Sequence, residues 1–467
     1  MVEASSTPKS DSRLLNRSLD VVDLVGLGLN GVVGAGIFLL PGNIARVAGG
    51  WSWAVYTGCA ALCFLIALCF AEMGSRFGRT GGAYVYATEA FGTFPGFLVG
   101  WIVWLAAVLG WASVAVPVAA MSGALAQPCQ NVLGCSFGLQ ALTHAWARFG
   151  FVAVLCTFLA YLNVRGASLG ARANNLFSVA KLLPLAIFVV LGACHIVASP
   201  FAHHAHWHGL ASLRDCFLWA VYLYSGFEDI AVPAGETRDA QRTIPIAIFV
   251  VLATATAVYV AVHLVAQGAF PALGHVKATA QGGESPLTDA ARAFLSDRGV
   301  LLVALGSVVS LLGTNASIAF TGPRSLYALA RDRFMPARLA TVSPRWHTPV
   351  AAIVLTSGLV VALPLVDRLG IRDFTLDELV RLSALASLLQ YIATCAAVIV
   401  IRRRTPSSRA SFMVAGGLAI PVIALACCAL LLAWADPVDR TRTLMGIALG
   451  VPLYWLARGT QPIAENE

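Results

Sequence analysis

The chain has 467 residues, of which 58% are hydrophobic and 12% are charged, and its mean hydropathy is +0.78. A soluble domain is about 45–50% apolar and about 25% charged, so this composition excludes an ordinary soluble protein. It also excludes a disordered chain, a coiled coil and a nucleic-acid-binding protein, despite the formal net charge of +8. The apolar runs are long and do not alternate with polar residues, which favours spanning helices over a membrane β-barrel.

Twelve apolar segments approach or exceed the roughly 20 residues that a membrane-spanning helix needs. In chain order they cover residues 21–47, 51–73, 92–124, 147–165, 173–198, 212–233, 243–268, 298–328, 349–366, 377–401, 411–435 and 441–457. Residues 1–20 are polar and lack the apolar core of a cleavable signal peptide. We therefore expect an all-α polytopic membrane protein with twelve spans, flanked by tails over residues 1–20 and 459–467.

The basic residues indicate the orientation in the membrane. Most of the 31 Lys and Arg residues fall in loops that would share one side with the N-terminus. The positive-inside rule then predicts a multi-pass protein of the cell inner (plasma) membrane with both termini cytoplasmic. The basic excess describes topology and requires no nucleic-acid partner.

Cysteine and histidine leave two questions open. Most of the 11 cysteines lie in or beside apolar segments, where small buried side chains are expected. Cys129 and Cys135 fall instead in a predicted outward loop, residues 127–135, where a disulfide would form if that side is oxidising. The outward segment His203–His208 has the side chains to bind a transition metal, but a solvated loop is the favoured interpretation.

The first apolar segment contains three glycines within six residues, Gly31, Gly34 and Gly36. In a helix interior each glycine costs about 1 kcal/mol relative to alanine. A single glycine would indicate close helix packing, which remains the alternative here. Three together predict an unwound stretch, whose freed backbone groups must line a cavity because they cannot face lipid.

The sixth segment has a similar interruption. Ser225 and Gly226 are followed by Glu228 and Asp229, then by Pro233. Two adjacent carboxylates at membrane depth mark function by default. Interrupted spans at corresponding positions of two halves indicate the binding site of a transporter. We therefore expect two inverted five-helix repeats, residues 21–200 and 201–405, followed by helices 11 and 12 within residues 406–458.

Broken helices suit a zwitterion. Helix N-termini present N–H groups and positive dipole to a carboxylate, and helix C-termini present carbonyls to an ammonium. An α-amino acid would use both, with its side chain against variable helix faces. The candidate substrate-binding residues, from the two breaks and from helix 3, are Val33, Gly34, Ala35, Gly36, Ile37, Trp104, Val108, Tyr222, Ser225, Gly226, Phe227 and Glu228. Trp111 and residues 310–315 of helix 8 are further candidates.

Four motifs in the right order resemble the amino acid–polyamine–organocation transporter superfamily, which shares the leucine-transporter fold. They are residues 34–38, residues 71–75 with 80–92, residues 226–228 with 235–245, and residues 324–336. The similarity covers roughly residues 20–405 and is closest to the basic amino acid and polyamine antiporter branch. It implies an amino acid permease that works by alternating access, as a symporter or an antiporter, without a cofactor.

Lys181 lies about a third of the way into the segment 173–198. A lone lysine there could extend its side chain to the cytoplasmic interface, which is the alternative without a transport role. In the proton-coupled members that this segment resembles, a helix-5 lysine replaces the sodium ion of sodium-coupled relatives. The resemblance implies that its ammonium meets carbonyls near Asn30 and Val33 and polar groups of helix 8 such as Thr314, Asn315 and Ser317. Deprotonation would loosen helix 1 from helix 5, so proton coupling or uncoupled exchange is implied, without sodium.

The remaining charges bear on the substrate. Members of the resembled family commonly have an acidic residue at the position of Glu228, where it helps to form the pocket or gate. Asp229 is a second candidate for coupling. Cationic substrates should need an acid beyond these, and the middle of helices 3 and 10 has none. We therefore expect neutral amino acids, with exchange of cationic amino acids or polyamines as the alternative.

Other classes of membrane protein fit less well. An enzyme would need a nucleophile–base pair or a metal cluster at membrane depth, and His263 stands isolated in helix 7. A channel would not need paired broken helices. We expect no enzyme activity and no metal, and as partners an amino acid, a proton and the lipid bilayer, with the chain a monomer or a homodimer.

Overall fold

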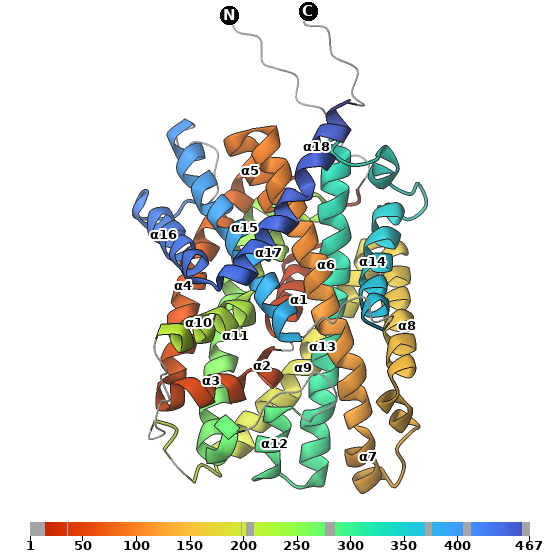
Figure 1. The fold of residues 1–467 in the computed structure, drawn as a ribbon, viewed down its shortest axis with the longest axis vertical. Coiled ribbons are helices and arrows are strands. Elements are labelled where there is room, and N and C mark those ends of the chain that lie inside the picture. The colour runs from red at the N-terminus through yellow and green to blue at the C-terminus, as the bar shows by residue number, and fades with distance from the viewer. Residues whose placement is uncertain are drawn as a thin grey trace, which may run out of the picture.

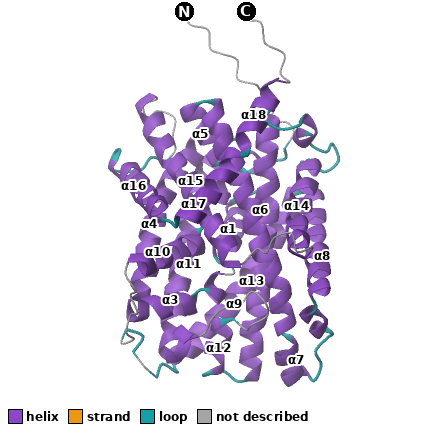
Figure 2. Cartoon of the chain, in the orientation of Figure 1, coloured by secondary structure: helices purple, strands orange, loops and turns teal. Residues whose placement is uncertain are grey.

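The computed structural model describes residues 15–34, 36–197, 199–201, 210–275, 285–368, 376–404 and 412–459. The first half contains α1 (Val21–Val32), α2 (Gly36–Leu39), α3 (Pro41–Ala48), α4 (Ser52–Arg76), α5 (Ala83–Phe91), α6 (Thr93–Ala124), α7 (Ala126–Leu133), α8 (Ala145–Val164) and α9 (Ala167–Ala193). The second half contains α10 (Leu210–Tyr224), α11 (Ala240–Ala269), α12 (Pro286–Arg292), α13 (Asp297–Arg331), α14 (Val350–Arg368), α15 (Leu376–Arg404), α16 (Ala419–Trp434), α17 (Pro437–Ala448) and α18 (Gly450–Gly459). Figure 2 shows helices and loops and no strand in this part of the chain, so the all-α prediction is confirmed.

Eight helical segments in the described ranges are long and apolar enough to cross a membrane, which confirms a polytopic membrane protein. A ninth candidate is the pair Ala419–Trp434 and Pro437–Ala457, bent by 112°. The prediction of twelve spans is not confirmed. α10 has only 15 residues and α14 has only a short apolar stretch, so these two helices and the bent pair account for the difference.

The helices form an elongated bundle with α1 near its centre (Figure 1). α1 packs against α9, α11 and α13, while α6 lies along α13 and α4 lies along α11. α8 and α14 lie side by side on one flank, and α16 lies beside α15 on the other. α5 and α18 reach the upper end in this view, and α7 and α12 reach the lower end. The division into two five-helix repeats stays a prediction.

The start of α1 is fixed by its own sequence. The Asp20 carboxylate accepts a hydrogen bond from the Asp23 amide over 3.0 Å, and the Asp23 carboxylate accepts one from the Asp20 amide over 3.2 Å. This reciprocal cap satisfies backbone donors that a helix start leaves without intrahelical partners. Just before the cap, the backbone of Leu19 pairs with the segment around Thr237, so the entry to α1 is joined to the segment that follows the second break.

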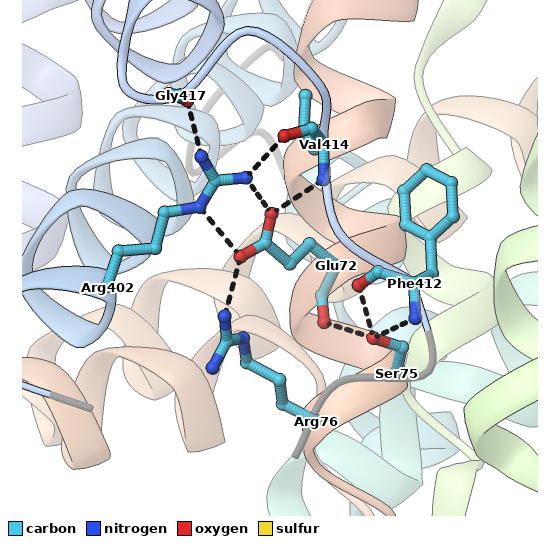
Figure 3. A network of polar contacts seen from close by, with 7 residues as sticks. All are labelled: Glu72, Ser75, Arg76, Arg402, Phe412, Val414 and Gly417. Atoms are coloured by element: carbon cyan, nitrogen blue, oxygen red, sulfur yellow. Dashed lines mark hydrogen bonds and ion pairs between the residues drawn. The ribbon is translucent and has the colours of Figure 1, made fainter. Parts of the chain in front are cut away.

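Two buried ion pairs hold the upper end of the bundle together. Arg324 of α13 binds Glu236 through two hydrogen bonds of 2.8 Å. Glu72, near the end of α4, accepts hydrogen bonds from Arg76, from Arg402 of α15 and from the Val414 amide (Figure 3). Breaking a buried pair by removing one partner costs about 3–5 kcal/mol, because the other charge stays buried. These pairs therefore fix α4, α13 and α15 relative to the segments beside them.

Candidate functional site

The first break lies where the three glycines predicted it. α1 ends at Val32 and α2 begins at Gly36, so the predicted interruption of the first span is confirmed. Helix packing is also close here, since a Cβ on Gly36 would lie 2.5 Å from Leu223 Cδ2. Unwinding and close packing therefore occur together. Ala35, a predicted substrate-binding residue, lies outside the described residues.

The second break begins after Tyr224, at the end of α10. Gly226 has φ +113°, in the left-handed region that favours glycine, and the 3₁₀ helix η4 (Phe227–Ala231) follows it. A Cβ on Gly226 would lie 2.6 Å from the carbonyl carbon of Gly31. The two breaks thus touch each other through bare backbone, and a side chain at this point would force them apart.

A cavity of about 80 Å³ lies between the two breaks. Eight of the predicted site residues line it: Gly34, Gly36, Tyr222, Ser225, Gly226, Glu228, Asp229 and Thr314. The rest of the lining in the described part of the chain consists of residues that were not among the predicted ones, and α15 is the one contributing helix that had not been assigned to the site. These residues are Gly31, Val32, Val103, Ala106, Ala107, Gly110, Val114, Leu223, Ile318, Ser383, Ser387 and Gln390. Backbone of the breaks and side chains of α6, α13 and α15 therefore share the lining.

Both carboxyl groups at the cavity have polar partners. Glu228 Oε2 accepts hydrogen bonds from the Gly226 amide over 2.8 Å and from the Tyr391 hydroxyl over 3.0 Å. Asp229 Oδ2 accepts one from the Thr321 hydroxyl over 3.2 Å. The Tyr391 ring also stacks on Phe227, with ring centroids 5.4 Å apart. Glu228 therefore ties the second break to α15.

A tyrosine of α11 connects the two broken helices. The Tyr259 hydroxyl lies 2.5 Å from the carbonyl oxygen of Val32 and 2.8 Å from that of Leu223. These carbonyls belong to the last turns of α1 and α10, where a helix leaves its carbonyls without intrahelical partners. One hydroxyl carries one proton, so it donates to one of the two carbonyls at a time.

Lys181 is fully buried between α9 and α1. Its Nζ donates a hydrogen bond of 2.6 Å to the Val33 carbonyl, and it lies 3.4 Å from the Asn30 carbonyl. The side chain therefore points at the end of α1 and does not extend to an interface. Ser310 of α13 donates to the same Val33 carbonyl over 3.1 Å, so two helices hold this one acceptor.

α13 holds α1 through hydroxyl groups. Thr314 donates to the Asn30 carbonyl over 3.0 Å, and Ser317 donates to the Leu27 carbonyl over 2.9 Å. Neither hydroxyl is bonded to Lys181. Together with Ser310, these residues form a row along α13 that donates to two carbonyls of α1 and to the Val33 carbonyl just beyond it.

A profile of the amino acid permease family matches residues 19–452. The chain belongs to this family. The match spans every helix named at the site, from α1 to α15, so the superfamily resemblance of the four motifs is confirmed. Membership identifies a multi-pass membrane transport protein and not an enzyme.

The names of related proteins state different substrates. The chain is 27% identical to a methylthioribose transporter of Bacillus subtilis, over 96% of this chain and 95% of the relative. It is 31% identical to cationic amino acid transporter 4 of Homo sapiens, over 86% of this chain and 63% of that longer protein. It is 26% identical to the branched-chain amino acid permease BcaP of Bacillus subtilis, over 98% of this chain and 95% of that relative. The names agree on small-molecule transport and not on one substrate class.

Several predicted residues of this permease lie beside the cavity and not on it. Trp104 and Val108 are buried, and the Trp104 indole donates to Thr356 of α14 over 3.2 Å. The cavity face of α6 is the stripe from Val103 to Val114, one residue away around the helix. Val33, Ile37 and Phe227 are likewise buried outside the lining, because at the breaks the backbone and glycines face the cavity.

Asn315 does not take the position predicted for it. Its Oδ1 accepts a hydrogen bond of 2.9 Å from the Trp111 indole, and its Nδ2 donates to the Leu311 carbonyl. It therefore bonds to α6 and its own helix, and not to Lys181. Successive residues of a helix are rotated by about 100°, so Thr314 and Asn315 cannot both face α1.

α15 carries a polar stripe that sequence reasoning missed. Ser383, Ser387 and Gln390 all line the cavity, and their spacing of four and three residues places them on one helix face. This pattern was visible in the sequence as three polar residues inside an apolar segment. Tyr259 and Tyr391 gave no such signal, since a tyrosine in an apolar helix is commonly a packing residue.

The remaining predicted features have no link to the cavity. Cys129 and Cys135 are free thiols, with Cys129 buried in α7 and Cys135 exposed beyond it, so the loop expected over residues 127–135 is largely helical. The His203–His208 segment falls outside the described residues. In the described ranges no group of three or more His, Cys, Asp and Glu side chains is arranged to hold a metal ion.

Proposed function

We propose that the chain is a secondary active amino acid transporter that works by alternating access, is coupled to protons and not to sodium, and carries neutral amino acids. The observation that carries this proposal is the contact of the buried Lys181 ammonium with the carbonyl of Val33 at the first break. A fixed cation at this point takes the place of a bound metal cation. The lysine can also gain and lose a proton, which a structural cation could not do.

The helix ends suit an α-amino acid. Leu223 at the end of α10 and the adjoining Ser225 and Gly226 line the cavity, and the carbonyl end of a helix suits an ammonium group. The starts of α2 and η4 reach the same cavity at Gly36 and Glu228 and suit a carboxylate, because the first N–H groups of a helix lack intrahelical partners. Both ends of a zwitterion would then be held by backbone, leaving side chains to select among amino acids.

The α6 side of the cavity favours a neutral substrate. The α6 face at the cavity consists of Val103, Ala106, Ala107, Gly110 and Val114, and these residues offer only small apolar contact. A side chain placed against this wall would be aliphatic, because an unpaired charge is costly in an apolar site. A specific observation favours a second candidate, cationic amino acid exchange: Glu228 and Asp229 both line the cavity.

In the transport cycle, Lys181 links protonation to the position of α1. Its protonated form donates to the Val33 and Asn30 carbonyls and holds α1 against α9. Loss of the proton removes the positive charge from these contacts and weakens the hold of α9 on the first break, so the end of α1 moves more easily and opens the cavity to one side. Substrate binding at the breaks and proton binding at Lys181 then act on the same helix.

Uptake by purified protein in liposomes tests the proposal. A panel of labelled neutral, cationic and acidic amino acids and methylthioribose is offered with an inward proton gradient, with an inward sodium gradient, or with neither. We expect saturable accumulation of neutral amino acids that needs the proton gradient. Accumulation driven by sodium would contradict the coupling. Cationic uptake only against internal cationic amino acid would establish the second candidate, and chemical conversion of the substrate would indicate an enzyme.

A further inference from the structure

A second cavity lies at the upper end of the bundle and shares no lining residue with the first. It has a volume of about 700 Å³, within the roughly 300–1,000 Å³ typical of sites for small molecules. One wall is the end of α13 and the turn leading to the 3₁₀ helix η7 (Ala337–Ala340), and the other wall is α18. Its lining is apolar apart from Arg331 and Arg333.

The two arginines differ in their partners. Arg331 pairs with Asp332 at 3.0 Å and donates to the Thr80 carbonyl. Arg79 pairs with the same carboxylate at 3.4 Å. Burial alone would raise the pKa of Asp332, but its hydrogen bonds from Arg331 and Tyr84 and the nearby Arg charges hold that pKa below its ordinary value. Arg331 is therefore neutralised within the protein.

Arg333 is exposed and has no charged partner among the residues that the structure describes. It stands in the left-handed turn that ends α13, with φ +66°. The Phe334 amide donates to the Leu329 carbonyl over 3.0 Å, which is the bond of a Schellman cap, and glycine is the usual residue at such a position. A left-handed conformation costs a non-glycine residue about 1–2 kcal/mol. The cap thus gains nothing from an arginine here.

One wall of the cavity, α18, carries exposed apolar side chains. Leu449, just before α18, is 66% exposed, and Trp455 and Leu456 on α18 are 60% and 69% exposed. Such exposure of apolar side chains is expected of a surface in contact with lipid. Tryptophan is enriched where a bilayer meets water. α18 and α5 reach the same end of the molecule in Figure 1, the end that the positive-inside rule predicts to be cytoplasmic. The cavity therefore combines an apolar interior, a lipid-facing wall and a free cation at the membrane boundary.

We propose that this cavity binds one anionic phospholipid of the adjoining leaflet. An acyl chain lies against Phe334, Met335 and Leu453, and the phosphate accepts hydrogen bonds from the Arg333 guanidinium. An apolar ligand without charge would leave Arg333 unused, and a soluble phosphate would leave the apolar walls exposed. Basic sites between helices on the cytoplasmic side recognise lipid head groups in this way. The lipid would join the end of α13 to α18. The middle of the same α13 carries the row of hydroxyl groups that bond to α1.

The test uses the full-length protein, purified in detergent, stripped of lipid and titrated with phosphatidylglycerol or phosphatidylcholine. Bound lipid is counted by native mass spectrometry, and thermal unfolding is followed in parallel. Arg333→Gly is the informative variant, because glycine suits the left-handed cap and folding is preserved. Arg403→Gln, a charge loss at an exposed position near the end of α15, is the matched control.

We expect the wild type and Arg403→Gln to bind phosphatidylglycerol more tightly than phosphatidylcholine and to unfold at a higher temperature with it. Arg333→Gly should bind it about fivefold more weakly, corresponding to about 1 kcal/mol for one arginine at a membrane surface. Equal binding of both lipids, or an equal loss in Arg403→Gln, would overturn the proposal. Binding that appears only after removal of residues 460–467 would also overturn it, because the tail of the chain would then be the occupant.

Discussion

Lys181 donates a hydrogen bond of 2.6 Å to the carbonyl oxygen of Val33, just beyond the last turn of α1. Both residues are fully buried, so the ammonium has exchanged water for backbone oxygens. An ion at this depth is expensive unless it is paired or used, and here the ammonium has carbonyls but no carboxylate within bonding distance among the described residues. The contact of α9 with the first break therefore depends on the charge of this one side chain.

Replacing Lys181 should uncouple transport from the proton gradient. In Lys181→Ala the Val33 carbonyl keeps only the bond from Ser310, so α9 no longer holds the first break in any protonation state. Asn174 and Ser178 still join α9 to the body of α1, so the helix itself stays in place. We expect proton-driven accumulation in liposomes to fall at least tenfold, while exchange of internal for external substrate persists. The measurement is uptake of labelled amino acid with and without an inward proton gradient.

The control for this variant is Leu183→Ala, two residues further along α9, where the side chain is exposed on the bundle surface. It should accumulate substrate like the wild type. Undiminished pH-dependent accumulation by Lys181→Ala would show that the lysine is structural and that the coupling group lies elsewhere.

Gly226→Ala should abolish transport. The new Cβ would lie 2.6 Å from the Gly31 carbonyl carbon, and the φ of +113° is strained for any residue with a side chain. Both effects push the two breaks apart, so we expect transport below a tenth of the wild-type rate. Initial rates of uptake, at matched protein levels in the membrane, measure the effect.

Gly358→Ala is the matched control, because a Cβ there meets no atom within 4 Å and the residue lies in the exposed face of α14. Alanine is the better helix former, so stability should not fall. If Gly226→Ala transported at half the wild-type rate or more, contact between the breaks would not be needed for the cycle.

Features that depend on one residue and its depth could be predicted from the sequence. Glycine within an apolar span weakens a helix wherever it occurs, so the break at Gly34 and Gly36 was predictable. The Lys181 ammonium must find oxygens at membrane depth, which restricts its partners. Features that depend on helix rotation were not predictable: Trp104 bonds to α14, whereas Val103, the residue just before it, lines the cavity.

Hydrogen-bond partners from segments far apart in the chain could not be predicted from the sequence either. Nothing local to Tyr259 indicates that its hydroxyl reaches both α1 and α10, because that depends on how α11 is seated against them. The number of spans was not confirmed for a different reason. Apolar length in the sequence does not reveal where a helix ends, and α10 stops at Tyr224 while the apolar run continues into the second break.

Tyr259→Phe should weaken the connection between the two breaks without unfolding the protein. The change removes one hydroxyl and leaves the Val32 and Leu223 carbonyls to compete for other donors. An unsatisfied buried acceptor costs about 1–3 kcal/mol, so we expect the apparent affinity for substrate, or the transport rate, to fall by about tenfold. Saturation curves of uptake separate the two effects.

Tyr161→Phe removes a hydroxyl from an exposed tyrosine of α8 and should leave both parameters unchanged. Equal kinetics for Tyr259→Phe and the wild type would show that the hydroxyl contacts of Tyr259 contribute only packing.

Glu72→Gln should destabilise the protein and release the segment before α16. The carboxylate accepts bonds from Arg76, Arg402 and the Val414 amide (Figure 3), and its side chain is fully buried. Glutamine leaves the arginine charges without their counter-ion, which costs about 3–5 kcal/mol at a buried pair. We expect a clearly lower unfolding temperature in detergent and faster hydrogen exchange at Val414. Glu89→Gln breaks the half-exposed pair with Arg79 and should cost no more than about 1 kcal/mol, so equal unfolding temperatures for the two variants would refute a stabilising role for the Glu72 network.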